Sequence, residues 1–97
     1  MGVTATQFVR HEDRLPIDVI IVSPNSKIRQ ILHEKLEASS WNVSEAGSGT
    51  RALELLEDRG SDDGVLLLDP MLPDLEPNEF HGIVKLRYPN TQILTLN

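Results

Sequence analysis

The sequence lacks cysteine, and it has few aromatic residues and no long apolar run. The absence of cysteine excludes disulfide bonds, a thiolate nucleophile and cysteine-bound zinc. No stretch approaches the roughly 20 apolar residues of a membrane-spanning helix. Residues 1–16 have no apolar segment of the kind that a secretory signal needs. We therefore predict a cytoplasmic protein with no membrane partner.

Positive charge is also scarce. The chain of 97 residues carries 9 Lys and Arg against 15 Asp and Glu, which gives a formal net charge of −6. Nucleic-acid-binding domains carry an excess of basic side chains on the binding face. The charge balance therefore argues against nucleic-acid binding by this chain alone.

The length of the chain allows one domain. Residues 1–16 are polar and aperiodic, and we predict a flexible N-terminal arm there. From residue 17 onward a regular pattern begins, which predicts a single α/β domain over residues 17–97.

Strand-like runs alternate with amphipathic helical patterns. The runs lie at 17–22, 41–46, 65–69 and 93–96. The first is nearly all β-branched, which is typical of a strand buried on both faces, whereas the second alternates as a strand near a sheet edge does. Strands that alternate with helices predict a parallel sheet with helices on its faces. We predict a flavodoxin-like sheet with strand order 2-1-3-4.

The predicted topology points to one place for a site. In open parallel sheets, ligands bind beyond the carboxyl ends of the strands, where the strand order switches. That point lies between the first and third strands, which are followed by Ser23 and Asp69. Asp69 is therefore the candidate functional carboxylate, and Asp74 follows in the same loop. An ordinary strand-terminating aspartate that binds nearby backbone explains Asp69 equally well.

Several segments also resemble a known family. The run 66–74 reads Leu-Leu-Leu-Asp-Pro-Met-Leu-Pro-Asp and resembles the phosphoacceptor segment of response-regulator receiver domains. Residues 22–29, 46–53 and 87–89 resemble three other segments of that family, in the same order. The resemblance covers everything after the arm and implies the CheY-like fold. It further implies a phosphorelay role, not an enzymatic one, in which Asp69 accepts a phosphoryl group from a histidine kinase with Mg²⁺ beside it.

The acidic site departs from the family pattern. Receiver domains carry two acidic residues at the end of the first strand to hold the ion, and here Ser23 and Pro24 stand in those places. Only Asp69 and, by family analogy, the backbone carbonyl of Met71 would remain as metal ligands, whereas Mg²⁺ prefers anionic oxygens. We predict weak or absent Mg²⁺ binding and slow or absent phosphorylation, as in a degenerate pseudo-receiver.

The predicted switch position differs as well. The family places a threonine or serine at the end of the fourth strand, where its hydroxyl binds the phosphoryl group. That place falls on Asn97, and Thr95 matches it only in a shifted register. An amide is bulkier than a hydroxyl and does not reorient in the same way. The resemblance therefore predicts an altered switch at Asn97.

The C-terminal edge of the sheet is the third departure. A complete receiver continues with a fourth helix, a fifth strand that carries a lysine, and a fifth helix, and none of these follows here. The resemblance therefore predicts a sheet that is incomplete at this edge. Residues 92–96 are uncharged and largely apolar, and such an edge invites pairing with another chain. We predict a homodimer, or aggregation, through this strand.

Three functions remain open from the sequence. The first is a degenerate receiver that acts as an interaction module, and the second is a phosphorylation-competent receiver with an atypical ion site. The third is a flavodoxin-like cofactor-binding domain, although no glycine-rich phosphate loop follows the first strand. The three histidines, His11, His33 and His81, show no metal-ligand spacing.

Overall fold

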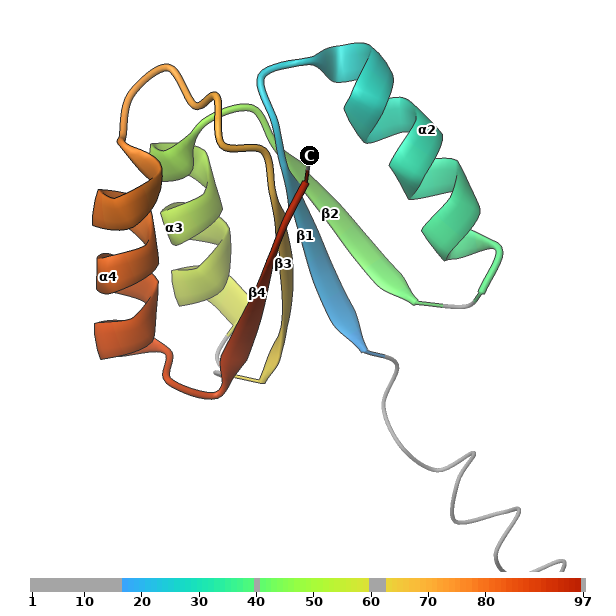
Figure 1. Cartoon of the computed structure of the whole chain (residues 1–97). Coiled ribbons are helices and arrows are strands. Elements are labelled where there is room, and N and C mark those ends of the chain that lie inside the picture. The colour runs from blue at the N-terminus through green and yellow to red at the C-terminus, as the bar shows by residue number, and fades with distance from the viewer. Residues whose placement is uncertain (1–16, 40, 60–62, 97) are drawn as a thin grey trace, which may run out of the picture.

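A computed structural model describes residues 17–39, 41–59 and 63–96. The arm predicted over residues 1–16 and the predicted switch residue Asn97 lie outside the described residues. Within those ranges, strands and helices alternate along the chain (Figure 1). The strands are β1 (Asp18–Val22), β2 (Asn42–Ala46), β3 (Gly64–Leu68) and β4 (Thr91–Thr95). The helices are α2 (Ser26–Glu37), α3 (Gly49–Arg59) and α4 (Pro77–Arg87).

The strands form one parallel sheet with the order β2-β1-β3-β4, which confirms the predicted flavodoxin-like arrangement. β1 lies inside the sheet, and four of its five residues are buried, as its β-branched run predicted. β2 lies at an edge and is only partly buried, as its alternation predicted. In the register of the sheet, Val22 lies beside Ala46 on β2 and beside Leu68 on β3. The carboxyl ends of these three strands are therefore level.

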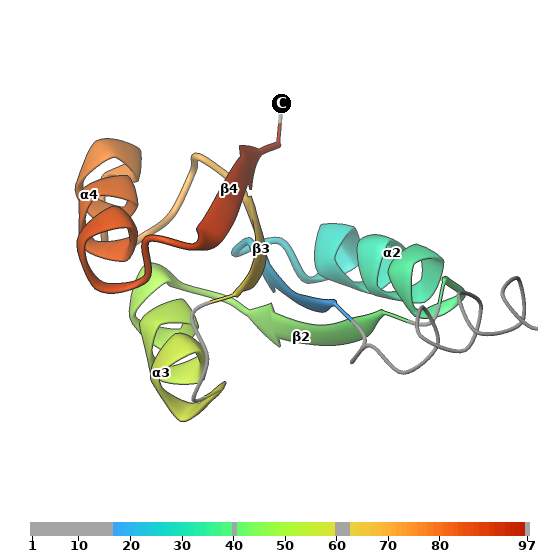
Figure 2. The same ribbon diagram turned by 90° about the horizontal axis from the view of Figure 1, so that it is seen from below.

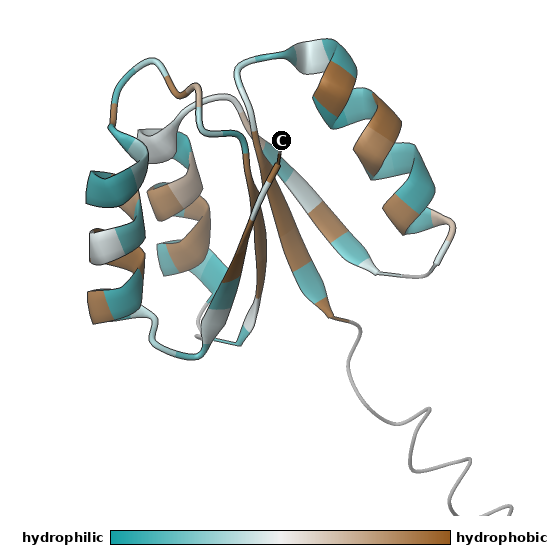
Figure 3. Cartoon of the chain, in the orientation of Figure 1, coloured by the Kyte–Doolittle hydropathy of each residue, from teal (hydrophilic) through white to brown (hydrophobic). Residues whose placement is uncertain are grey.

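The helices cover the two faces of the sheet unequally. α3 and α4 lie on one face, and α2 lies alone on the other, beside β1 and β2 (Figure 2). The main core fills the space between the sheet and the two-helix face, where Leu66 and Leu68 pack with Phe80 and Val84. The strands are rich in apolar residues, while the helices alternate apolar and polar positions (Figure 3). This arrangement leaves β3 and β4 without a helix on the α2 side among the described residues.

Two capping side chains and a proline begin the helices. Oδ1 of Asn25 accepts hydrogen bonds from the backbone N–H groups of Lys27 at 3.0 Å and Ile28 at 3.2 Å, so Asn25 is the N-cap of α2. Ser48 Oγ accepts from the backbone N–H of Arg51 at 3.1 Å and caps α3. Pro77 occupies the first turn of α4, where its missing N–H costs nothing.

β4 begins at Thr91, two residues before the strand that the apolar run predicted. The backbone N–H of Thr91 donates to the carbonyl of Tyr88 at 3.0 Å, which closes a tight turn after α4. Thr91 is buried, and its hydroxyl accepts a hydrogen bond of 3.0 Å from Nη2 of Arg59 at the end of α3. A polar residue can therefore begin the strand, because its buried hydroxyl has a hydrogen-bond partner on α3. The apolar periodicity of the sequence does not indicate such a partner.

Candidate functional site

The carboxyl ends of β1 and β3 bring Ser23 and Asp69 together. The backbone N–H of Asp69 donates to the carbonyl of Val22 at 2.8 Å, so the sheet ladder continues one residue past β3. The backbone N–H of Ser23 likewise donates to the carbonyl of Ala46 at 3.0 Å. Between the two, the buried Ser23 donates a hydrogen bond of 2.8 Å from Oγ to Oδ2 of Asp69. Ser23 and Asp69 together form the candidate site.

Hydrogen bonds fix both oxygens of the Asp69 carboxylate. Oδ1 accepts from the backbone N–H of Met71 at 2.9 Å, while Oδ2 accepts from Ser23. Ser23 Oγ in turn accepts from the backbone N–H of Asn25 at 3.1 Å. Asp69 is half-buried at the switch point of the sheet. This geometry is compatible with both interpretations of Asp69, as a strand-terminating residue and as a phosphoacceptor.

The metal site predicted at Asp69 and the backbone carbonyl of Met71 stays a prediction. Met71 presents its backbone N–H to Asp69, and its side chain is largely exposed. Pro24 is exposed and has no side-chain oxygen. Within the part of the chain that the structure describes, no group of three or more His, Cys, Asp or Glu side chains is placed to hold a metal ion. One carboxylate and one neutral hydroxyl supply little of the anionic oxygen that Mg²⁺ prefers, so weak binding of Mg²⁺ stays the prediction.

A cation that the sequence analysis did not assign to the site lies next to Ser23. Nη1 of Arg29, on α2, donates to the backbone carbonyl of Ser23, and its Nε donates to Oε1 of Glu45 on β2 at 3.2 Å. Its guanidinium also lies over Gly47, where an added Cβ would be 3.4 Å from Nη1. In the sequence, this role of Arg29 could have been inferred from its position in the first turns of the helix that follows β1, the strand that ends at the candidate site.

Glu45 links this arginine to a histidine. Oε2 of Glu45 contacts Nδ1 of His33 on α2, and Glu37 lies 3.4 Å from Nε2 on the other side of the same imidazole. The hydrogen bond with Glu45 is the main reason that the pKa of His33 is raised above its ordinary value of 6.5, and Glu37 adds to the effect. A protonated His33 therefore ties α2 to β2 beside the candidate site.

Replacing His33 with glutamine is expected to remove a pH-dependent part of the stability. Because the pKa of His33 is raised in the folded state, its contribution is complete below the unfolded value of 6.5 and is lost as the pH rises through the folded value. We expect the wild-type chain to exceed the variant by about 0.5 kcal/mol at acidic pH, as for a partly exposed ion pair. Urea unfolding between about pH 5 and pH 8 measures this difference.

The exposed His81 on α4 provides the matched control for that experiment. His81→Gln leaves the contacts of His33 with Glu45 and Glu37 in place. A stability difference between wild type and His33→Gln that stays constant, or grows, as the pH rises above 6.5 would contradict the assignment.

Asp74 fastens the loop after β3 to the start of α3. Its Oδ1 accepts from the backbone N–H of Gly49 at 2.9 Å. Its Oδ2 accepts from the backbone N–H and the hydroxyl of Thr50, at 3.0 and 2.6 Å. The Thr50 hydroxyl, followed by the backbone N–H groups of Thr50 and Gly49, lowers the pKa of Asp74 to about 2. Leu75 packs there as well, since a Cβ on Gly49 would lie 2.6 Å from its Cδ1. Asp74 is therefore engaged with α3 and not with Asp69.

Asp74→Ala is expected to lower the free energy of unfolding by about 1 kcal/mol, the usual cost of removing a helix-capping side chain. The contribution is present at neutral pH and is lost as the pH falls below the ordinary value of 3.8 toward about 2, since the folded-state pKa is depressed. Urea unfolding at neutral pH measures the change. Glu76→Ala serves as the control, because Glu76 makes no side-chain capping bond to α4. An equal loss in both variants would refute the capping role.

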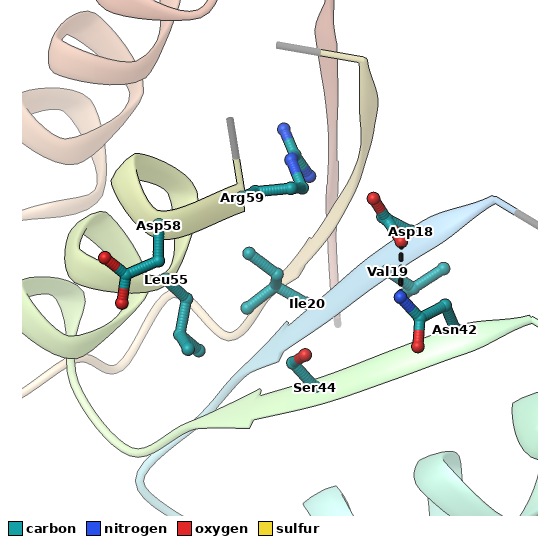
Figure 4. A pocket seen from close by; sticks show the side chains of 8 residues that line it. All are labelled: Asp18, Val19, Ile20, Asn42, Ser44, Leu55, Asp58 and Arg59. Carbon is teal, nitrogen blue, oxygen red and sulfur yellow. Dashed lines mark hydrogen bonds between the residues drawn. The ribbon is translucent and has the colours of Figure 1, made fainter. Parts of the chain in front are cut away.

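A hollow lined by both polar and apolar side chains lies at the opposite end of the sheet (Figure 4). It has a volume of about 200 Å³ and lies between the starts of β1 and β2 and the end of α3. Asp18 accepts a hydrogen bond of 2.6 Å from Nδ2 of Asn42 there, and Asp58 and Arg59 line the α3 side. Gly64 faces the same arginine with a φ of +144°, and an added Cβ would lie 2.4 Å from Nη1 of Arg59. Asp18 is thus remote from Asp69, because it begins β1 whereas Asp69 follows the end of the parallel strand β3.

A comparison with known proteins relates the chain to a regulatory protein. No family model matches the chain. The chain is 26% identical over 88 residues to a probable transcriptional regulatory protein, TcrX, of Mycobacterium tuberculosis. The match covers 91% of this chain and 37% of that protein. The chain thus resembles a regulatory protein over nearly its whole length, but it spans little more than a third of that relative.

None of the helices in the described part of the chain is long and apolar enough to cross a membrane.

Proposed function

We propose that the chain is a receiver-like, non-enzymatic signalling domain of a response regulator, degenerate at its acidic site, which acts by binding partner proteins. The observation that carries this proposal is the hydrogen bond between Ser23 and Asp69. It places an aspartate at the switch point of a receiver-like sheet but gives it a hydroxyl where a receiver has carboxylates. The similarity to a transcriptional regulatory protein supports a regulatory role.

The chemistry of phosphoryl transfer explains why a hydroxyl in place of the carboxylates of a receiver matters. A carboxylate oxygen of Asp69 would attack the phosphorus of a phosphohistidine, the P–N bond would break, and the histidine nitrogen would take a proton. The transferring group carries negative charge that cations must offset. Ser23 is neutral and Pro24 has no side-chain oxygen to hold a metal ion, while Arg29 is already engaged with Glu45. We therefore expect Asp69 to accept phosphoryl groups slowly or not at all.

Incubation with acetyl phosphate and Mg²⁺, followed by intact-mass spectrometry, tests this proposal. We expect no added mass in the wild-type chain. An added phosphoryl group that disappears in Asp69→Ala and remains in Asp74→Ala would overturn the degenerate assignment. That result would favour the alternative, a receiver that is competent to accept a phosphoryl group on Asp69 from a histidine kinase.

The partner surface that we propose first is the outer edge of β4, through which two copies would pair. β4 is bonded to β3 on one side, and no other strand adjoins it among the described residues. The segment Thr91–Thr95 carries no charge or proline that would block pairing. The backbone N–H of Leu96 donates to Leu68 of β3, so the alternation of a parallel ladder directs the N–H of Thr95 outward.

Thr95→Pro tests this pairing, because it removes an outward N–H without breaking the bonds to β3. We expect analytical ultracentrifugation to show a dimer for the wild-type chain and a monomer for the variant. A wild-type chain that stays monomeric at every concentration measured would refute pairing through β4.

A further inference from the structure

A chain of polar contacts joins His33 to the candidate site. Oε2 of Glu45 contacts Nδ1 of His33, and Oε1 of the same carboxylate accepts from Nε of Arg29 at 3.2 Å. Nη1 of Arg29 donates to the backbone carbonyl of Ser23, whose Oγ donates to Oδ2 of Asp69 at 2.8 Å. A titratable imidazole on α2 is therefore connected, contact by contact, to the carboxylate at the end of β3.

The imidazole of His33 lies between two carboxylates that only its protonated form can satisfy. Glu45 faces Nδ1, and Glu37 lies 3.4 Å from Nε2. A neutral imidazole has one N–H donor, whereas the imidazolium has two. Loss of the proton therefore leaves one carboxylate without a donor from His33, and it removes the positive charge beside both. Glu37 is 69% exposed, so water can replace its partner, while Glu45 keeps Arg29 as the neighbouring cation.

The charges that face His33 in the described part of the chain come from α2 and β2. On α2, Glu37 and Arg29 lie four residues after and before it, on the same side of the helix. On β2, Glu45 is the one charged residue. β1 also contacts α2, but its one charged residue, Asp18, bonds to an amide of β2 at the hollow toward α3. The remaining charged residues of α2 are exposed and lie neither three nor four positions from the imidazole: Lys27, Glu34 and Lys35.

Arg29 divides its donors between Glu45 and the candidate site. Its guanidinium is a planar fork that binds two acceptors at once. While His33 is protonated, two cations share the charge of Glu45, and its attraction for Arg29 is weaker. When His33 is neutral, the full charge of Glu45 attracts Arg29 and weakens its hold on the carbonyl of Ser23. The side chains of Arg29 and Glu45 are only 20% and 33% exposed, so solvent screens this competition incompletely.

We infer that His33 is a proton-sensitive control on the candidate site, which acts through Glu45 and Arg29 on Ser23 and Asp69. Protonation leaves Arg29 free to hold Ser23, and Ser23 then orients the Asp69 carboxylate. Loss of the proton relaxes that hold. Coupling between two sites is reciprocal, so a change of charge at Asp69 also changes the proton affinity of His33. As regulation of the candidate site, the inference rests on the proposed function.

The pH range of this control follows from the contacts of the imidazole. The hydrogen bond with Glu45 is the main reason that the pKa of His33 is raised above 6.5. The hold on Ser23 is therefore complete below pH 6.5, and it relaxes as the pH rises through the folded-state pKa.

Nuclear magnetic resonance of the full chain tests the coupling. The backbone N–H of Asn25 donates to Ser23 Oγ at 3.1 Å, and that of Met71 donates to Asp69 Oδ1 at 2.9 Å. These two amides therefore report on the two members of the candidate site. We expect both amide signals to shift between about pH 5 and pH 9 with the same midpoint as the ring of His33.

Three variants separate the contact chain from an effect through space. Arg29→Lys keeps the positive charge but lacks the fork that reaches both Glu45 and Ser23. We expect it to lose most of the shift at both amides while the ring of His33 still titrates. His33→Gln should abolish the shifts. His81→Gln is the matched control, because His81 is exposed on α4, and it should keep them.

Glu45→Gln provides a second test, should the lysine variant fail to fold. It removes the shared charge with little change of shape. The pKa of His33 should fall, and both amides should lose their response to it. Circular dichroism confirms that each variant is folded.

Three results would overturn the inference. These are site amides that do not follow the midpoint of His33, a shift that survives in His33→Gln, or a full shift in Arg29→Lys or Glu45→Gln. None of these readouts depends on phosphorylation, so a failure of the coupling is distinguishable from a failure of the degenerate assignment.

Discussion

Ser23→Asp is expected to make the stability of the domain depend on Mg²⁺, which the wild-type chain should not show. Ser23 Oγ lies 2.8 Å from Oδ2 of Asp69, so an aspartate there brings two carboxylates into contact. Like charges about 4 Å apart repel by about 1 to 4 kcal/mol, depending on the local dielectric. Without metal, the variant should therefore unfold at a temperature lower by about 5 °C or more.

Magnesium should reverse this loss, since two carboxylates supply the anionic oxygens that the ion requires. A ligand present at 100 times its dissociation constant stabilises the folded state by about 2.7 kcal/mol. Thermal unfolding with and without millimolar Mg²⁺ measures the effect. Ser23→Asn is the control, because it has nearly the shape of aspartate without its charge. The prediction fails if Mg²⁺ stabilises the wild-type chain as much as Ser23→Asp.

Phe80→Ala is expected to lower the free energy of unfolding by about 4 kcal/mol. Phe80 is fully buried and packs with Leu66, Leu68 and Val84, so its loss leaves a cavity between α4 and the sheet. Small domains are stable by only about 5 to 15 kcal/mol, so this loss is a large share of the total. Urea unfolding followed by circular dichroism measures it.

Leu86→Ala is the matched control for that measurement. Leu86 lies on the same helix and is 84% exposed, and a change there should stay within about 0.5 kcal/mol. A loss of less than about 2 kcal/mol for Phe80→Ala would mean that the core between α4 and the sheet repacks around the missing ring.

The fold followed from the sequence because its signals are local. The β-branched run before Ser23 and the alternation around Val43 decide which strand is central and which lies at the edge. The meeting of Ser23 and Asp69 also followed, since parallel strands of known order align their carboxyl ends. The roles of Asp69 as phosphoacceptor and of Met71 as metal ligand remain predictions, because they depend on chemistry that position alone does not decide.

Other parts of the site depend on contacts between distant segments. Asp74 looks like any loop carboxylate in the sequence, and only the folded chain brings it 2.9 Å from the backbone N–H of Gly49. The contact of Arg29 with Ser23, and that of His33 with Glu45, depend on how α2 is rotated over the sheet. Periodicity indicates the apolar side of a helix, but it does not assign partners to the polar side chains along its border.

The place of β1 between β2 and β3 has a consequence for local unfolding. Its amides are paired on both sides and buried, so their hydrogen exchange should require opening of the whole sheet, whereas β4 is bonded on one side only within the described part of the chain. Ser23 and Asp69 are thus attached to the slowest-exchanging strands. The outer edge of the sheet, by contrast, belongs to a strand that opens at lower energy. The candidate acidic site is therefore the rigid part of the domain, and the edge of β4 is the part that can adapt its shape to a partner.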